Sequence, residues 1–103
     1  MTNHLHKGDL PGDVELGPRV AVDTETQGLS LVRDKVCLVQ LSAGDGDSHI
    51  VQLDRNSYEC PRLKALLADR GVEKLFHFAR FDVAVILRDL GVETAPVFCT
   101  KIA

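Results

Sequence analysis

Asp23 and Glu25 stand two positions apart in the apolar segment VAVDTET. On a β-strand, alternate side chains project from the same face, so the two carboxylates share one side, roughly 6.5 to 7 Å apart at the backbone. Unpaired charges inside a sheet are costly, and a divalent cation relieves that cost. Oxygen ligands suit Mg²⁺ or Mn²⁺, which also accept substrate phosphate oxygens. The pair indicates a metal site, with a solvated entry to a turn as the alternative.

Asp82 is a third candidate ligand, in the first turn of a helix predicted over residues 79–90. At about 100° per residue, Asp82 lies next to Ile86 on the helix surface, so its carboxylate borders the buried face. The alternative is that Asp82 only complements the helix dipole, a role worth a few tenths to about 1 kcal/mol.

The elements that must position these acids read as three neighbouring strands followed by alternating helix and strand, which predicts an α/β domain with a mixed sheet. β-branched and apolar runs between turn residues mark the strands, while Pro61 and Gly71 mark the limits of the first helix. The expected strands are residues 20–26, 36–42, 49–53, 74–78 and a last one beginning within 94–99; the expected helices are residues 61–70 and 79–90.

Length and composition limit what this domain can be. A chain of 103 residues allows one domain, and 45% hydrophobic with 26% charged residues is typical of a globular protein. No segment approaches the apolar run that crosses a bilayer, and the first residues lack a secretory signal, so we expect a cytoplasmic location. The formal charge of −3 gives no global attraction to nucleic acid, so phosphate binding requires a local patch or recruited cations.

The three cysteines, Cys37, Cys60 and Cys99, are widely spaced and form no C-x-x-C pair. An odd number at such spacing argues against both a disulfide framework and a structural zinc site. We expect reduced thiols.

Taken together, the two acidic segments resemble the first two exonuclease motifs of the DEDD superfamily. These are Asp23-Thr24-Glu25 on a strand and the segment FHFARFD, residues 76–82, leading into a helix. With the intervening VCLVQL, residues 36–41, they are more similar to ribonuclease D and its relatives than to DNA polymerase proofreading domains. The resemblance spans about residues 14–103. It implies a ribonuclease H-like fold with a mixed five-stranded central sheet flanked by helices.

The resemblance implies a metal-dependent 3′-5′ exoribonuclease, which hydrolyses the 3′-terminal phosphodiester of RNA and releases nucleoside 5′-monophosphates. Asp23, Glu25 and Asp82 would be the catalytic residues and would bind two divalent ions, Mg²⁺ or Mn²⁺, about 3.5 to 4 Å apart. One ion would activate a water and the other would stabilise the leaving 3′ oxygen.

The same resemblance places further residues near the substrate. The segment after Glu25, which is Thr26, Gln27, Gly28 and Leu29, would lie against the terminal nucleotide. His77 would help to order the site, although a histidine on a strand is more often a structural residue. Arg80 lies beside the site, but an exposed helical arginine is usually solvated.

The chain departs from the family pattern in two places. The third motif, a Tyr or His followed after three residues by Asp, supplies the fourth ligand and the group that positions the attacking water, and no such pattern follows Asp82. Cys99 stands where the family often has Asp. We therefore expect residues 1–103 to form a single but incomplete exonuclease domain, truncated at the C-terminus, with weak activity and a tendency to self-associate through uncovered sheet.

Two other classes stay open at this point. One is a non-catalytic module that keeps the fold and binds nucleic acid or a partner, which the absent third motif makes plausible. The other is an unrelated small α/β protein with coincidental acids. The sequence contains no recognisable base-reading element, so it does not decide between RNA and single-stranded DNA.

Overall fold

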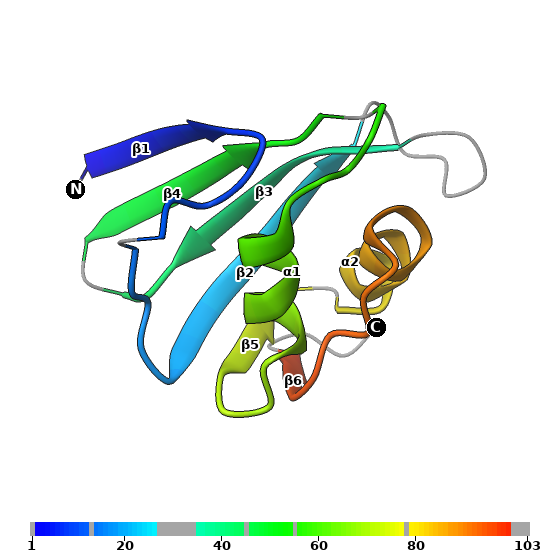
Figure 1. Cartoon of the computed structure of the whole chain (residues 1–103). Helices are drawn as coiled ribbons and strands as arrows, with labels where there is room; N and C mark the ends of the chain where they lie inside the picture. The colour runs from blue at the N-terminus through cyan, green and yellow to red at the C-terminus, as the bar shows by residue number, and fades with distance from the viewer. Residues whose placement is uncertain are drawn as a thin grey trace.

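The protein forms one six-stranded sheet with two helices packed on it, as seen in a computed structural model that describes residues 2–12, 14–26, 35–44, 46–54, 56–77 and 79–99. Strand order is β1-β4-β3-β2-β5-β6 (Figure 1). The elements are β1 (Thr2–Lys7), β2 (Arg19–Thr26), β3 (Val36–Ser42), β4 (Asp47–Gln52), α1 (Pro61–Ala68), β5 (Glu73–Phe76), α2 (Ala79–Val85), the π-helical turn η1 (Ile86–Leu90) and β6 (Val97–Cys99).

The sheet is mixed, as the sequence predicts. Strand β2 pairs antiparallel with β3 and parallel with β5, while β3 and β4 are antiparallel and β5 and β6 are parallel. Strand β2 is therefore central, with two strands on one side and three on the other. The DTE segment pairs with β3 on one side, and the printed pairing of β2 with β5 covers only Arg19 to Ala21, before this segment begins.

The described residues contain one strand more than the five that the family resemblance implies. The additional strand β1 runs parallel to β4, with His4 opposite His49 in the register. The rings of His4 and His49 stack with centroids 4.8 Å apart, and Nε2 of His6 lies 3.0 Å from Nδ1 of His49. Backbone pairing with β4 and packing of the imidazole rings hold this edge strand in place. Its sequence contains no run of β-branched residues from which a strand could be predicted.

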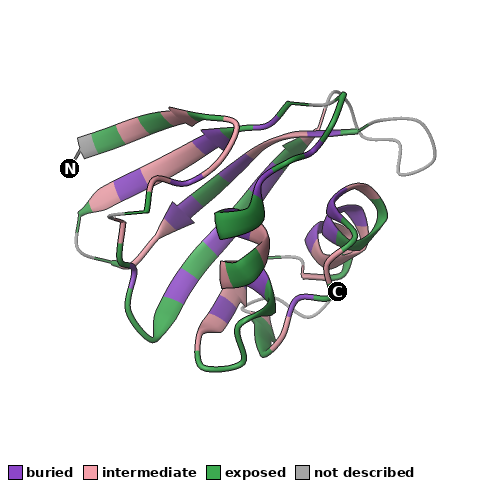
Figure 2. Ribbon diagram, in the orientation of Figure 1, coloured by how far each residue is buried: buried purple, intermediate pink, exposed green. Residues whose placement is uncertain are grey.

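One face of the sheet carries the apolar core. Along β2, Val20, Val22 and Thr24 are buried while the residues between them are exposed, an alternation that Figure 2 shows along the strand. Leu63 and Leu67 of α1 and Val85 and Ile86 of the second helical segment belong to the same core cluster; from the strands, Val39, Leu41 and Val51 join it. Both helices therefore cover the Thr24 side of β2.

The opposite side of β2 carries Ala21, Asp23 and Glu25, all exposed. Leu5 of β1 is 60% exposed. The acidic pair thus lies on the sheet face that neither α1 nor α2 covers. No helix in the described part of the chain is both long and apolar enough to span a bilayer.

Lys74 of β5 is a fully buried cation on the core side. Its Nζ donates hydrogen bonds to the backbone oxygens of Asp69, at 2.5 Å, and Ala95, at 2.8 Å. Burial lowers the pKa of Lys74, and the nearby Asp69 carboxylate opposes that effect. The side chain therefore ties β5 to the segments on either side of it through two backbone carbonyl groups.

Helix α1 is capped by a side chain from far away in the sequence. Its N-cap residue, Cys60, makes no side-chain capping bond. Instead, Asp9 Oδ2 accepts the N–H of Arg62 at 2.9 Å and Asp9 Oδ1 accepts the N–H of Leu63 at 2.8 Å. A carboxylate at this end also complements the helix dipole. The contact fixes α1 against the segment that leads from β1 into β2.

We predict that Asp9→Ala lowers the free energy of unfolding by about 1 to 2 kcal/mol, because the first turn of α1 loses its acceptor. Urea denaturation measures the change. The matched control is Glu15→Ala, since Glu15 is exposed in the same segment and forms no hydrogen bond or ion pair in the structure that is described. Equal stability of the two variants would contradict the capping role of Asp9.

Candidate metal-binding site

The acidic pair sits at the C-terminal end of β2, beside an irregularity in the sheet. Asp23 pairs with Gln40 and Glu25 with Leu38, and the register between β2 and β3 shifts between Glu25 and Thr26. Such a shift redirects side chains and backbone at the end of a pairing, a feature common beside active sites. Next to it, Sγ of Cys37 donates to the backbone oxygen of Glu25 at 3.2 Å. The strand therefore delivers two exposed carboxylates at the point where its regular pairing ends.

Asp82 approaches the same strand from the helical layer. It lies in the first turn of α2 and is only 5% exposed. Its Oδ1 accepts a hydrogen bond from the Thr24 hydroxyl at 2.5 Å, across 58 positions of sequence. Thr24, 7% exposed, stands between the two acids of β2. The structure thus brings Asp82 of the second motif into contact with Thr24 of the first.

The pKa of Asp82 is shifted by burial and by its polar and charged neighbours. Burial raises the pKa of Asp82 from 3.8 to about 6. The hydrogen bond from Thr24 lowers that pKa, while the charges of Asp23 and Glu25 raise it further. Three carboxylates within electrostatic reach of each other, one of them buried, form a local concentration of negative charge that attracts a divalent cation.

A second carboxylate anchors the other end of the same helical segment. Asp89 lies in η1, and its Oδ2 accepts the N–H of Val36, the first residue of β3, at 2.9 Å. The guanidinium of Arg88 also contacts Asp89, with Nε 2.7 Å from Oδ1. The hydrogen bond from Arg88 holds the pKa of Asp89 below its usual value. Asp82 and Asp89 therefore fix α2 and η1 to two neighbouring strands.

The structure places the remaining predicted residues as follows. Thr26 is half-buried at the end of β2, opposite Val36, and His77 is exposed directly after β5. Gln27, Gly28 and Leu29 lie outside the described residues, so their predicted contacts with a nucleotide stay predictions. Arg80 is exposed on α2. Cys99, at the position where the family often has Asp, accepts the N–H of Ala79 at 3.4 Å, which places its sulfur at the start of α2.

The donor chemistry of Asp23, Glu25 and Asp82 fits a hard divalent cation, because all three offer carboxylate oxygens. Within the described ranges, however, no three His, Cys, Asp or Glu side chains are arranged as a closed group that holds an ion. Asp82 comes from the core side of β2, and the other two acids project from the opposite side. The three carboxylates of the described residues thus approach the end of β2 from two sides, and an ion bound by all three would require their side chains to turn toward one another.

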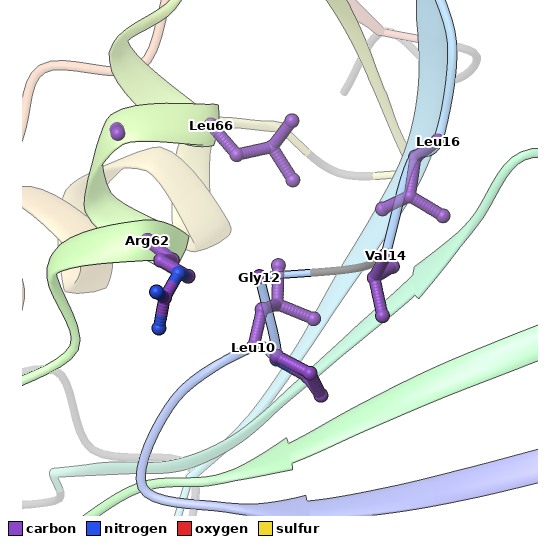
Figure 3. Close-up of a pocket in the computed structure, with 8 residues that line it drawn as sticks. Leu10, Gly12, Val14, Leu16, Arg62 and Leu66 are labelled. Carbon is purple, nitrogen blue, oxygen red and sulfur yellow. The ribbon is translucent and has the colours of Figure 1, made fainter.

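A pocket of about 230 Å³ lies elsewhere, between the N-terminal segment and α1 (Figure 3). Leu10, Val14, Leu16 and Leu66 give it apolar walls, and Arg62 stands on its α1 side. None of the three acids lines it. The mainly apolar lining is typical of a gap at the edge of the hydrophobic core. The three carboxylates are therefore the stronger candidate for a functional site.

Comparisons with known proteins show the family to which the chain belongs. A family model described as 3′-5′ exonuclease matches residues 9–103. The chain is similar to ribonuclease D of Acidiphilium cryptum, with 34% identity over 86 residues that cover 84% of this chain and 22% of that protein. It is also similar to ribonuclease D of Gluconacetobacter diazotrophicus, with 36% identity over 98 residues, covering 92% of this chain and 25% of that protein. The chain thus spans about a quarter of these relatives.

Solved structures show the same arrangement. Brucella melitensis NrnC with bound Mg²⁺ superposes with a TM-score of 0.92 at 45% identity, covering 98% of this chain and 51% of NrnC. Escherichia coli RNase D gives a TM-score of 0.62 at 27% identity over 81% of this chain and 22% of that protein. The mixed α/β arrangement is therefore that of ribonuclease H-like exonucleases, and the chain corresponds to about half the length of NrnC.

Asp82→Asn should stabilise the metal-free protein at pH 7. A pKa raised from 3.8 to about 6 means that the folded state prefers the neutral carboxyl. The neutral Asp82 side chain therefore contributes to the free energy of unfolding below pH 4, and this contribution is lost as the pH rises through 6. The rise corresponds to about 3 kcal/mol at most. The amide removes the buried charge and keeps an oxygen for Thr24.

Chemical denaturation in the presence of a chelator measures the difference at pH 4 and at pH 7. Asp89→Asn is the opposite control, because the pKa of Asp89 is lowered and its charge is stabilising at pH 7. A lower free energy of unfolding for Asp82→Asn at pH 7 would contradict the prediction, because it would mean that other groups stabilise the charged carboxylate of Asp82.

Proposed function

The chain belongs to the family of 3′-5′ exonucleases, and from this premise we propose that it forms the metal-binding part of a ribonuclease D-like exoribonuclease. The reaction is the hydrolysis of the 3′-terminal phosphodiester of RNA, with release of a nucleoside 5′-monophosphate. The observation that carries the proposal is the contact of Asp82 with Thr24, which joins the two carboxylate motifs at one end of β2. Residues 1–103 then make up a single, incomplete exonuclease domain.

In this proposal Asp23, Glu25 and Asp82 hold two Mg²⁺ or Mn²⁺ ions. When bound, the ions lower the pKa of a water and neutralise charge on the phosphate and the leaving 3′ oxygen. The chain's own contribution is to fix the ligands. Strand β2 carries two of them on a central, paired strand, and the buried Asp82 adds a third from the helical layer. The exposed side of Asp23 and Glu25 gives the RNA end access to the site.

RNA is the proposed partner. Brucella melitensis NrnC has been solved bound to pGG, and Trypanosoma brucei RNase D in complex with RNA U12. Thr26 follows Glu25 at the end of β2 and His77 directly follows β5, and both are proposed to contact the terminal nucleotide. Single-stranded DNA is the alternative substrate, and the cytoplasmic location expected from the sequence stays a prediction.

The 103-residue chain alone should be a weak enzyme. It carries three of the four carboxylates of the family pattern and lacks the group that positions the attacking water. Loss of such a group lowers the rate by roughly 10² to 10⁴. We predict that mononucleotide release from 3′-labelled single-stranded RNA, with Mg²⁺ or Mn²⁺, is at least about 10²-fold slower than with a complete ribonuclease D.

The measurement needs Asp23→Ala and a chelator as controls. Residual release that both controls abolish supports the proposed site, and release as fast as with the complete enzyme would contradict the weak activity. The alternative function, a non-catalytic binding module, gives a different pattern. RNA binding that persists in Asp23→Ala and without divalent metal, with no hydrolysis in any condition, would favour that alternative.

We also propose that the chain self-associates through the sheet face that neither α1 nor α2 covers. Exposed Ala21 and Leu5 and half-buried Leu38 and Ile50 lie on that side of the sheet. Apolar surface of this kind favours association. Light scattering should show a mass that rises with concentration, and Leu5→Lys should lower it. A monodisperse monomer at high concentration, with a sharp unfolding transition, would count against this proposal.

A further inference from the structure

We propose that Thr24 is a positioning residue for the cation site: its hydroxyl holds Oδ1 of Asp82 and leaves Oδ2 to the cation. This inference rests on the proposed function, because it assigns a task within the same site. The task differs from that of Asp23 and Glu25, since Thr24 touches a ligand and not the ion. Loss of a group that orients a metal ligand in this way typically lowers metal affinity by about 10- to 100-fold.

The contact is rigid on both sides. Thr24 lies opposite Val39 in the middle of the sheet, and both residues are buried. A threonine side chain is branched at Cβ, so its rotamers are few and its hydroxyl has a restricted direction. A buried hydroxyl without a partner costs free energy, and the partner of this one is Asp82, 2.5 Å away. The strand therefore fixes the carboxylate, and not the reverse.

The second oxygen of Asp82 is the one available to a ligand. Within the described residues, Asp82 makes one side-chain hydrogen bond, and it uses Oδ1. Among the described residues, Thr94 Oγ1 is the one side-chain oxygen or nitrogen atom that is fully buried without a hydrogen-bond partner, so Asp82 Oδ2 is not such an atom. Oδ2 of Asp82 therefore retains accessible surface while the rest of the residue is buried. An oxygen with that exposure, on a carboxylate fixed by its other oxygen, is suited to accept a cation.

The position of Thr24 in the strand gives it this task. Because side chains alternate, Asp23 and Glu25 point to one face of β2 while Thr24 points to the other, where α2 lies. The same three residues thus supply two ligands and the support for the third. Any displacement of the strand moves all of them together, which keeps the spacing of the carboxylates constant. A hydroxyl is needed at this position, since a methyl group of equal size offers no hydrogen to Asp82.

The test compares metal binding and stability in four forms of the 103-residue chain: the unchanged chain, Thr24→Val, Thr24→Ser and Asp89→Ala. Thr24→Val keeps the shape and removes the donor, while Thr24→Ser keeps the donor. Asp89→Ala removes the other anchor of the helical segment, at the contact with Val36, and touches none of the proposed ligands. Mn²⁺ titration followed by the electron paramagnetic resonance signal of the free ion gives affinity, and thermal melts with a chelator give stability.

We expect Thr24→Val to weaken Mn²⁺ binding by about 10- to 100-fold, and Thr24→Ser to restore most of it. Asp89→Ala should lower the melting temperature and leave the affinity of the folded protein within about threefold of the unchanged chain. This pattern separates positioning from mere stabilisation, because Thr24→Val and Asp89→Ala each lose a hydrogen bond that holds the helical segment to the sheet, and only Thr24→Val loses affinity.

Affinity of Thr24→Val within threefold of the unchanged chain would overturn the positioning role, even if the variant melts earlier. Equal weakening by Thr24→Val and Asp89→Ala would overturn it as well, since a general loosening of the helical segment then explains both. Failure of the proposed function looks different: the unchanged chain itself shows no Mn²⁺ binding that Asp23→Ala removes.

Discussion

The hydrogen bond between Thr24 and Asp82 is the contact on which the site depends. It is the point where the helical layer meets the central strand, and both partners are buried there. The sheet order puts β2 between β3 and β5, and the parallel connection from β2 to β5 brings the chain back beside it before α2 begins. The first turn of α2 then delivers Asp82 to the end of β2, close to Asp23 and Glu25. Fold and site are therefore consequences of the same topology.

The same contact supports the proposed metal site at the end of β2. A buried carboxylate beside two others opposes folding at neutral pH, and a divalent cation removes that opposition. Asp89, at the other end of the helical segment, is the reverse case: its charge is balanced by Arg88 and by the N–H of Val36. Asp89 fixes the helical segment with a balanced charge, whereas the charge of Asp82 is unbalanced and is proposed to serve a ligand. The segment between them includes a π-helical turn, a feature that often accompanies functional sites.

Much of this arrangement is predictable from the sequence, because local signals and tertiary structure agree. The strand at residues 36–42 and the start of α1 at Pro61 follow the apolar runs and turn residues that bound them. The acidic residues could be assigned from spacing and from the resemblance, and the comparisons confirm the family. Strand β1 was missed because its polar sequence carries no strand signal, and its formation depends on pairing with β4. The burial of Lys74 was missed because its acceptors are backbone oxygens, of Asp69 in the preceding loop and of Ala95 further along the chain, and no side-chain pattern indicates them.

Contacts between distant residues are the part that the sequence leaves open. Asp9 caps a helix that begins more than fifty positions later, and no spacing rule connects the two. Thr24 looks like an ordinary strand residue, and only its hydrogen bond to Asp82 gives it a task. In both cases the sequence supplies a suitable side chain and the fold supplies the partner.

The most direct test of the account is the position of a bound ion. Crystals of the chain soaked in Mn²⁺ give an anomalous scattering signal that locates the metal independently of any assumption about ligands. The account predicts a peak at the end of β2, with Asp82 Oδ2 and a carboxylate oxygen of Asp23 or Glu25 at about 2.1 Å. A fully occupied Mn²⁺ that contacts Asp23 and Glu25 while Asp82 stays out of reach, or one that binds at the histidines of β1 and β4 instead, would contradict it.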